Sequence, residues 1–225
     1  MAQCPFAKQV VISGPTGPYA GGPFRIVHHT TEGSTAAGAF AAFRAHRSDP
    51  HFTVDDTEIY QHIDTTQWSR SLVHTAGQPE TNREHAVQIE AVGFAGYAKG
   101  RAVLENVARL CRWIEQTHGV PLVWPNGYPK PAVNHNDPGG HNRNMANWLA
   151  DGGHYGHCHV PENVHWDPAY EKVEVDYLMA LEVDPAFNLV VTPAAAALAA
   201  QLPTKGPAAI SGHAIIPAEG VDHPG

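Results

Sequence analysis

The sequence predicts a single α/β domain in which helices flank a central mixed β-sheet. Short apolar runs of strand length alternate with helical segments, and no linker or internal repeat divides the 225 residues, a length that suits one domain. Charged residues make up only 16% of the chain, which also contains 21 Gly and 19 Pro. This composition is typical of a compact domain with long loops, which we expect at one edge of the sheet.

The first half of the chain supplies strands on both sides of one helix. Residues 1–23 are rich in Pro and Gly and predict an irregular arm, and FRIVHH at 24–29 predicts a short buried strand. The Ala-rich residues 34–47 follow good N-cap residues and predict a helix. Two alternating runs within 51–62 predict a β-hairpin, and the polar residues 63–85 predict a long loop.

The second half begins with AVQIEAVGF at 86–94, the clearest strand pattern in the chain. Apolar residues at helical spacing predict an amphipathic helix over 100–117 that ends at Gly119. The expected elements after it are a loop at 120–145, a strand at 153–160, a loop at 161–168, helices at 169–182 and 193–202, and a mobile tail from Thr204. We expect an arm over 1–23, a main domain over 24–182 and a C-terminal extension with a short Ala-rich helix over 183–225.

Charge and hydropathy exclude several classes of partner. The net charge is −8 with neutral histidines and no run of Lys or Arg exceeds two residues, so nucleic acid is not an expected partner. No apolar stretch approaches the ~18 residues of a membrane span. The first 25 residues show no Sec-type signal, and the spacing of three cysteines predicts neither a disulfide framework nor a zinc ribbon. We therefore expect a reduced compartment.

Histidine is unusually abundant, with 16 residues in the chain and a cluster between His135 and His165. Histidine is the commonest metal ligand and the usual proton carrier near neutral pH, so this composition predicts a metal site or acid–base chemistry. His28 and His29 close the first strand, where alternation lets only one of them face a given site. Phe24, Ile26 and His28 share one strand face; the alternative is a hydrogen-bonded pair of histidines without a ligand role.

Two further places carry candidate residues. Glu90 shares a strand face with Gln88; burial there raises a carboxyl pKa toward the range of a general base, whereas on an edge strand it is only a solvated carboxylate. The segment GHYGHCHVPENVHWDP at 153–168 is dense in ligand types, although a solvated His-rich loop is the alternative. A metal that needs two imidazoles and one carboxylate can take His28, His157 and Asp167. HExxH and GxSxG motifs do not occur in the chain.

Four motifs together resemble the zinc-dependent type 2 N-acetylmuramoyl-L-alanine amidases, a family that includes phage lysins, cell-wall and recycling amidases and peptidoglycan recognition proteins. The resemblance covers roughly residues 20–182. It rests on their order and spacing: IVHHTTEG (26–33), HFTVDD (51–56), TNREHAVQIEAVGFAG (81–96) and GHCHVPENVHWDP (156–168).

The resemblance implies one zinc ion per chain, held by His28, His157 and Asp167 in a cleft lined by the long loops. It implies that Glu90 is the general base or orients the attacking water. The family often has a lysine two residues before the metal-binding acid, where it stabilises the oxyanion. This chain has His165 there, which can donate the same hydrogen bond when protonated. Ala169 also departs from the usual DPG.

The implied reaction is hydrolysis of the amide between N-acetylmuramic acid and L-alanine in peptidoglycan or muropeptides. Trp68, Arg70 and Asn82 lie where the hairpin and loop would border the cleft, and we expect them to contact substrate. The alternatives are a peptidoglycan-binding module without turnover and a zinc hydrolase of another amide. A cytoplasmic location, or delivery to the wall by lysis or a non-Sec route, fits the absence of a Sec signal.

Overall fold

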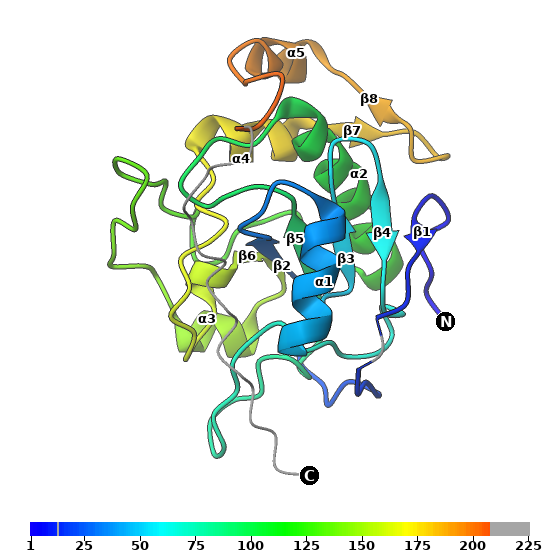
Figure 1. Cartoon of the computed structure of the whole chain (residues 1–225), viewed down its shortest axis with the longest axis vertical. Helices are drawn as coiled ribbons and strands as arrows, with labels where there is room; N and C mark the ends of the chain where they lie inside the picture. Colours follow the sequence, from blue (N-terminus) through cyan, green and yellow to red (C-terminus); the bar gives the residue numbers. More distant parts are fainter. Residues whose placement is uncertain (13, 208–225) are drawn as a thin grey trace.

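The computed structural model describes residues 1–12 and 14–207. The mobile tail expected from Thr204 therefore lies largely outside the described residues. Within them, no helix is long and apolar enough to cross a bilayer. The architecture is the single α/β domain with a mixed sheet that the sequence predicts (Figure 1).

The central sheet has six strands in the order β1-β4-β3-β5-β2-β6. The antiparallel β3–β4 pair confirms the predicted hairpin, and the other neighbours pair in parallel. A separate two-stranded sheet is formed by β7 and β8. The strands are β1 (Lys8–Gln9), β2 (Arg25–Thr30), β3 (Phe52–Val54), β4 (Ile59–Gln61), β5 (Ala86–Ala91), β6 (Gly153–Gly156), β7 (Glu182–Val183) and β8 (Leu189–Val190).

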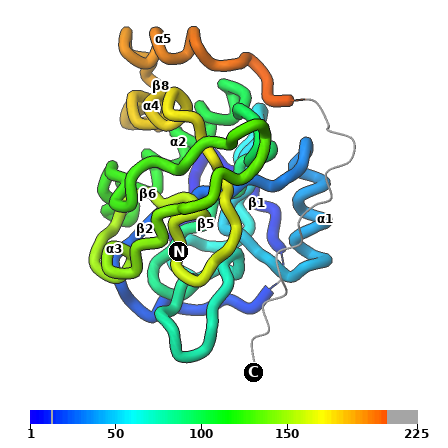
Figure 2. Tube along the Cα trace, turned by 90° about the vertical axis from the view of Figure 1, so that its left-hand side faces the viewer, coloured from blue at the N-terminus to red at the C-terminus, as the bar shows by residue number. Residues whose placement is uncertain are grey.

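Helices cover both faces of the sheet. The main hydrophobic core joins the apolar face of β2 and β5, including Ile26 and Ile89, to residues of α2, α4 and α5. On the other face, α1 lies in front of the strands as Figure 1 shows, and its Phe43 is buried. The helices are α1 (Ala36–His46), α2 (Arg101–His118), α3 (Met145–Ala150), a 3₁₀ turn at His157–His159, α4 (Lys172–Ala180) and α5 (Pro193–Ala199). Helix α5 lies beside α4 at one end of the molecule (Figure 2).

Helix α2 forms because its apolar residues recur on one face. Val103, Val107, Leu110 and Ile114 lie on that stripe and are buried, as their spacing predicts. Gly119 ends the helix with φ of 68°, the left-handed conformation that glycine adopts without a steric cost. This helix supports the strands that carry the candidate site.

Several elements differ from the sequence expectation. The strand expected over 153–160 ends at Gly156, where the chain turns into the 3₁₀ helix, and the loop expected after Gly119 is followed by α3. The N-terminal arm is not wholly irregular, because β1 pairs with β4 at the sheet edge. Helix α3 begins where the Asn144 side chain accepts from the Asn147 backbone amide as an N-cap. The sequence did not predict this helix, because asparagine is also typical of turns and several asparagines lie nearby.

Candidate metal centre and active site

The parallel register of three strands brings the candidate residues to one edge of the sheet. On β2 and β5, His29 is paired with Glu90, so the two side chains leave the sheet on the same face. On the other side of β2, His28 is paired with Gly156, which places His157 directly after the end of β6. Ligands commonly bind at the carboxyl ends of parallel strands, and the site lies there.

His28 does not lie with His157 and Asp167, which corrects the sequence expectation. Side chains alternate along β2, so His28 follows Ile26 onto the α2 face of the sheet, where it lies beside Cys111 and His154. The next residue, His29, faces the opposite way. The ligand-type group on the Glu90 face is His29, His157 and Asp167, whose candidate ligand atoms lie within 4.8 Å of one another.

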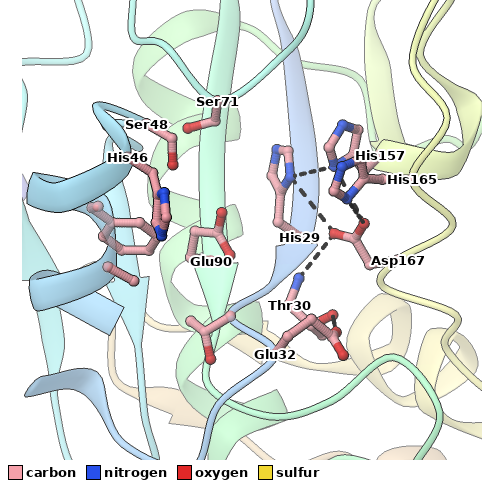
Figure 3. A pocket seen from close by; sticks show the side chains of 13 residues that line it. His29, Thr30, Glu32, His46, Ser48, Ser71, Glu90, His157, His165 and Asp167 are labelled. Carbon is pink, nitrogen blue, oxygen red and sulfur yellow. Dashed lines mark hydrogen bonds and ion pairs between the residues drawn. The ribbon is translucent and has the colours of Figure 1, made fainter. Parts of the chain in front are cut away.

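The three side chains point toward one another and line one pocket (Figure 3). His29 Nδ1 lies 3.0 Å from His157 Nδ1 and 3.7 Å from Asp167 Oδ2. His157 Nδ1 lies 3.2 Å from Asp167 Oδ1. The Thr30 backbone N–H donates to Asp167 Oδ2 at 3.1 Å, which fixes the carboxylate against β2.

The outward ring nitrogens show how the two imidazoles are protonated. His157 Nε2 contacts Asn163 Oδ1 at 2.9 Å, and this oxygen also accepts from the Val73 amide. Because that amide contact identifies the oxygen, His157 Nε2 carries a proton and donates. His29 Nε2 likewise contacts Gln88 Oε1 at 2.7 Å. In neutral imidazoles this leaves both Nδ1 lone pairs facing inward, toward each other and the carboxylate.

Such an arrangement requires a positive charge at its centre. Burial alone raises the pKa of the Asp167 carboxyl, but the charge that His157 carries when protonated, and its hydrogen bond, lower that pKa below its usual range. Burial and the His157 ring lower the pKa of His29 to about 3, so a proton on His29 is disfavoured. Tetrahedral zinc spaces nitrogen and oxygen ligands about 3.3–3.5 Å apart. The residues present therefore fit a zinc ion held by His29, His157 and Asp167.

Glu90 lines the same pocket and is 8% exposed. Its Oε2 is buried and has no hydrogen-bond partner among the described residues. Burial, with smaller contributions from the Asp167 and Glu32 carboxylates, raises the pKa of Glu90 well above its usual value. A raised pKa makes the Glu90 carboxylate a stronger proton acceptor than an exposed one, as a general base requires.

Other residues complete the pocket walls. Glu32 lies on the loop after β2, where its Oε1 accepts from the Thr30 hydroxyl at 2.6 Å and from the Ala95 amide at 2.8 Å. Burial raises the pKa of Glu32 as well. His46 of α1 and Ser48 line the pocket beside Glu90, on the side away from His157 and Asp167 (Figure 3).

His165 lies in the pocket, as the sequence predicts. Its ring stacks on that of His157, with centroids 4.8 Å apart and planes 5° from parallel. His165 Nδ1 lies 4.0 Å from Asp167 Oδ1. The backbone carbonyl of His165 accepts from Arg143, which anchors this part of the loop.

Trp68, Arg70 and Asn82 do not line this pocket, which corrects their expected placement. Arg70 forms a buried ion pair with Asp49, and the Asn82 amide binds the backbone of Leu72 in both directions. The Trp68 ring is buried and lies under the Arg83 guanidinium. The three side chains hold the 63–85 loop instead, and the loop residue that reaches the pocket is Ser71.

Sequence reasoning missed His29, Gln88 and Asn163 as parts of the candidate metal centre. The alternation on the first strand already placed His28 with Ile26 on the apolar face, and Gln88 with Glu90 on the other. Pairing the two polar faces identifies His29. Asn163 has no such signal, because its partner Val73 lies 90 residues away in the sequence.

A family model described as N-acetylmuramoyl-L-alanine amidase matches residues 22–170. No curated protein matches the chain.

Among solved structures, an AmpD derivative superposes with a TM-score of 0.50 at 15% identity, covering 78% of this chain and 96% of its own. Staphylococcus aureus hydrolase AmiA, solved with its ligand, gives a TM-score of 0.49 at 18% identity, covering 74% of each chain. At these identities the AmpD likeness concerns the fold. The family match spans well over half of the sequence and includes every residue of the candidate metal centre, and the chain belongs to the type 2 N-acetylmuramoyl-L-alanine amidase family.

Proposed function

We propose that this protein is a zinc-dependent amidase that hydrolyses the bond between N-acetylmuramic acid and L-alanine in peptidoglycan or its soluble fragments. The observation that carries the proposal is the His29–His157–Asp167 group beside Glu90, a carboxyl in the same pocket with one oxygen that has no partner in the described part of the chain. Family membership supplies the substrate class.

Zinc would be held by His29 Nδ1, His157 Nδ1 and one Asp167 oxygen. When bound there, it supplies Lewis acidity toward the amide carbonyl and lowers the pKa of water. Gln88 and Asn163 hold the two imidazoles with their lone pairs inward. Thr30 holds the carboxylate, so the three ligands are oriented before any ion arrives.

Glu90 would accept the proton of the attacking water and return it to the leaving amine of L-alanine. Its unpartnered Oε2 leaves a hydrogen-bonding position for that water, and its raised pKa lets it carry the proton between the two steps. Burial is the main cause of that raised pKa, and Glu32, a second carboxylate in the same pocket, adds a smaller contribution.

His165 would donate a hydrogen bond to the oxyanion that develops on the lactyl carbonyl. Its place in the pocket, stacked on His157, puts it beside the reacting group. Replacement by lysine, the residue often found there in the family, preserves a donor. We expect His165→Lys to keep most turnover and His165→Ala to lose about 10²–10³-fold in kcat.

We assign the catalytic unit to residues 24–182, which include every residue of the metal centre. The C-terminal extension contributes α5, whose Ala195 and Ala199 pack into the main core. This packing supports a structural role for the described part of the extension.

The test compares the wild type with Glu90→Gln and with the surface control Glu58→Gln, on purified sacculi and on a soluble muropeptide. We expect the wild type and the control to release stem peptides. Glu90→Gln should bind the same amount of zinc and lose turnover by at least about 10²-fold. The better substrate separates a wall lysin from a recycling enzyme. Zinc binding without release from either substrate would contradict the proposal and favour a binding module or a hydrolase of another amide.

A further inference from the structure

A second group of metal-ligand side chains lies on the opposite face of the sheet. His28 lies on β2, His154 lies on β6 and Cys111 lies on α2; their side chains are almost completely buried. One nitrogen from each ring and the Cys111 sulfur lie within 4.8 Å of one another. This trio is separated from the pocket by the sheet itself, because consecutive residues of β2 point to opposite faces.

The two rings of this trio are arranged as in the pocket centre. His28 Nε2 and His154 Nδ1 face each other at 3.0 Å. The outward nitrogens have partners: His154 Nε2 contacts Glu115 Oε1 at 3.0 Å, and His28 Nδ1 lies 3.5 Å from the Tyr170 hydroxyl. A metal-binding histidine usually gives its other N–H to a carboxylate, which fixes the ring and makes the free nitrogen more basic.

The support continues beyond Glu115. Its second oxygen accepts from Arg112 at 2.9 Å, and Arg112 also donates to the Leu178 carbonyl at 3.1 Å. The Trp124 ring stacks on His28 with centroids 5.1 Å apart. The trio therefore has rigid, oriented rings in an apolar enclosure. Such a site suits a metal ion that exchanges its hydration water for protein ligands.

The donor set selects the kind of ion. Two imidazoles and a thiol are ligands of zinc and of other borderline or soft transition metals, and not of magnesium or calcium. Tetrahedral zinc spaces its nitrogen and sulfur ligands about 3.3–3.6 Å apart. In the trio, the two inward nitrogens lie 3.0 Å apart, and all three candidate ligand atoms lie within 4.8 Å of one another.

We propose that His28, Cys111 and His154 form a second, buried transition-metal site, with zinc as its ion. On binding, the Cys111 thiol loses its proton to solvent and the sulfur joins the two inward nitrogens as a ligand. The ion would tie β2, β6 and α2 together, and the protein would hold two zinc ions where the family resemblance implies one.

A metal-free alternative makes a different prediction. Without a metal, these side chains can form a series of hydrogen bonds that all donate in one direction. The Tyr170 hydroxyl donates to His28, His28 donates to His154, and His154 donates to Glu115. That series satisfies every ring nitrogen and leaves Cys111 as an ordinary buried thiol. The two states differ in metal content and in the presence of a sulfur ligand.

The test uses the full chain, freed of metal with a chelator and reloaded with zinc or cobalt. We expect two zinc ions per wild-type chain and, with cobalt, a near-ultraviolet charge-transfer band from a thiolate ligand. The pocket centre offers only nitrogen and oxygen, so this band reports the buried site. His29→Ala should hold one zinc and keep the band, whereas Cys111→Ala should hold one zinc and lose it.

Two controls keep the result interpretable. Cys4→Ala removes another thiol of the same core, and Cys158→Ser removes the buried thiol that follows His157 in the sequence; both should keep two ions and the band. X-ray absorption at the zinc edge of the wild type needs no variant and should show a sulfur neighbour at about 2.3 Å. A wild type with one zinc, no band and no sulfur neighbour would overturn the second site. These readouts do not depend on turnover, so the site and the amidase activity are tested separately.

Discussion

Gln88 offers a sharp test of how the pocket holds its ligands. Its side chain is fully buried, its Oε1 contacts His29 Nε2 at 2.7 Å, and its Nε2 has no partner among the described residues. Gln88→Leu keeps the volume and removes both polar groups. It leaves the His29 N–H unpaired, which costs about 1–3 kcal/mol, and removes an unpaired amide nitrogen that costs a similar amount.

The two effects on folding nearly cancel, whereas the effect on metal binding does not. We expect the free energy of unfolding of the metal-free protein to change by no more than about 1 kcal/mol. The His29 ring loses the partner that keeps its lone pair inward, so zinc affinity at the pocket should fall about 10–100-fold. That is about 1.4–2.7 kcal/mol.

Zinc affinity is measured by adding zinc back to chelator-treated protein in the presence of a competing chelator, with turnover as the readout of zinc at the pocket. Denaturant unfolding of the metal-free protein measures its stability. Gln88→Glu retains an acceptor for His29 and is the matched control, with affinity equal to or tighter than the wild type. Unchanged zinc affinity in Gln88→Leu would refute the assignment of His29 Nδ1 as the ligand atom.

Three further predictions follow from buried charges. Burial raises the pKa of Glu90, so the folded metal-free protein loses stability as pH rises above the ordinary glutamate range. Thermal unfolding should therefore show that Glu90→Gln raises the Tm of the metal-free protein by a few degrees at pH 7 and changes it little near pH 4. Arg70→Met leaves the Asp49 carboxylate buried and unpaired and should cost about 3–5 kcal/mol in denaturant unfolding, much of which Asp49→Asn in the same chain should restore. Lys99 donates to the carbonyl of Pro168, which follows the proposed metal ligand Asp167 in the chain. Lys99→Met should therefore weaken zinc binding several-fold in the same chelator competition. The exposed control Lys8→Met should leave zinc binding unchanged.

Local patterns of polar and apolar residues predicted much of the fold. The alternation of polar and apolar residues in AVQIEAV placed Glu90 on the face opposite the core, and the stripe on 100–117 predicted α2 with its glycine end. The hairpin around Asp55 followed from the same reasoning. These features depend on neighbours within a few residues, which is the range over which periodicity reports.

The site depended on contacts that periodicity does not report. Strand alternation showed that only one of two adjacent histidines faces the pocket, and the register between β2 and β5 decided that it is His29. The loop residues Arg70 and Asn82 were expected at the substrate, because nothing local shows that Arg70 meets Asp49 in the core. A polar residue in a loop fits both roles equally well until its long-range partner is known.

The central claim is the bond that the protein cleaves, and oxygen-18 water tests it most directly. A defined muropeptide is incubated with the zinc-loaded protein in oxygen-18 water, and mass spectrometry measures the masses of the products. The account predicts a peptide with a free L-alanine amino group and one labelled oxygen in the lactyl carboxylate of the sugar product, both lost with Glu90→Gln. Label in a peptide carboxylate, or an intact glycan–peptide bond with bound zinc, would contradict it.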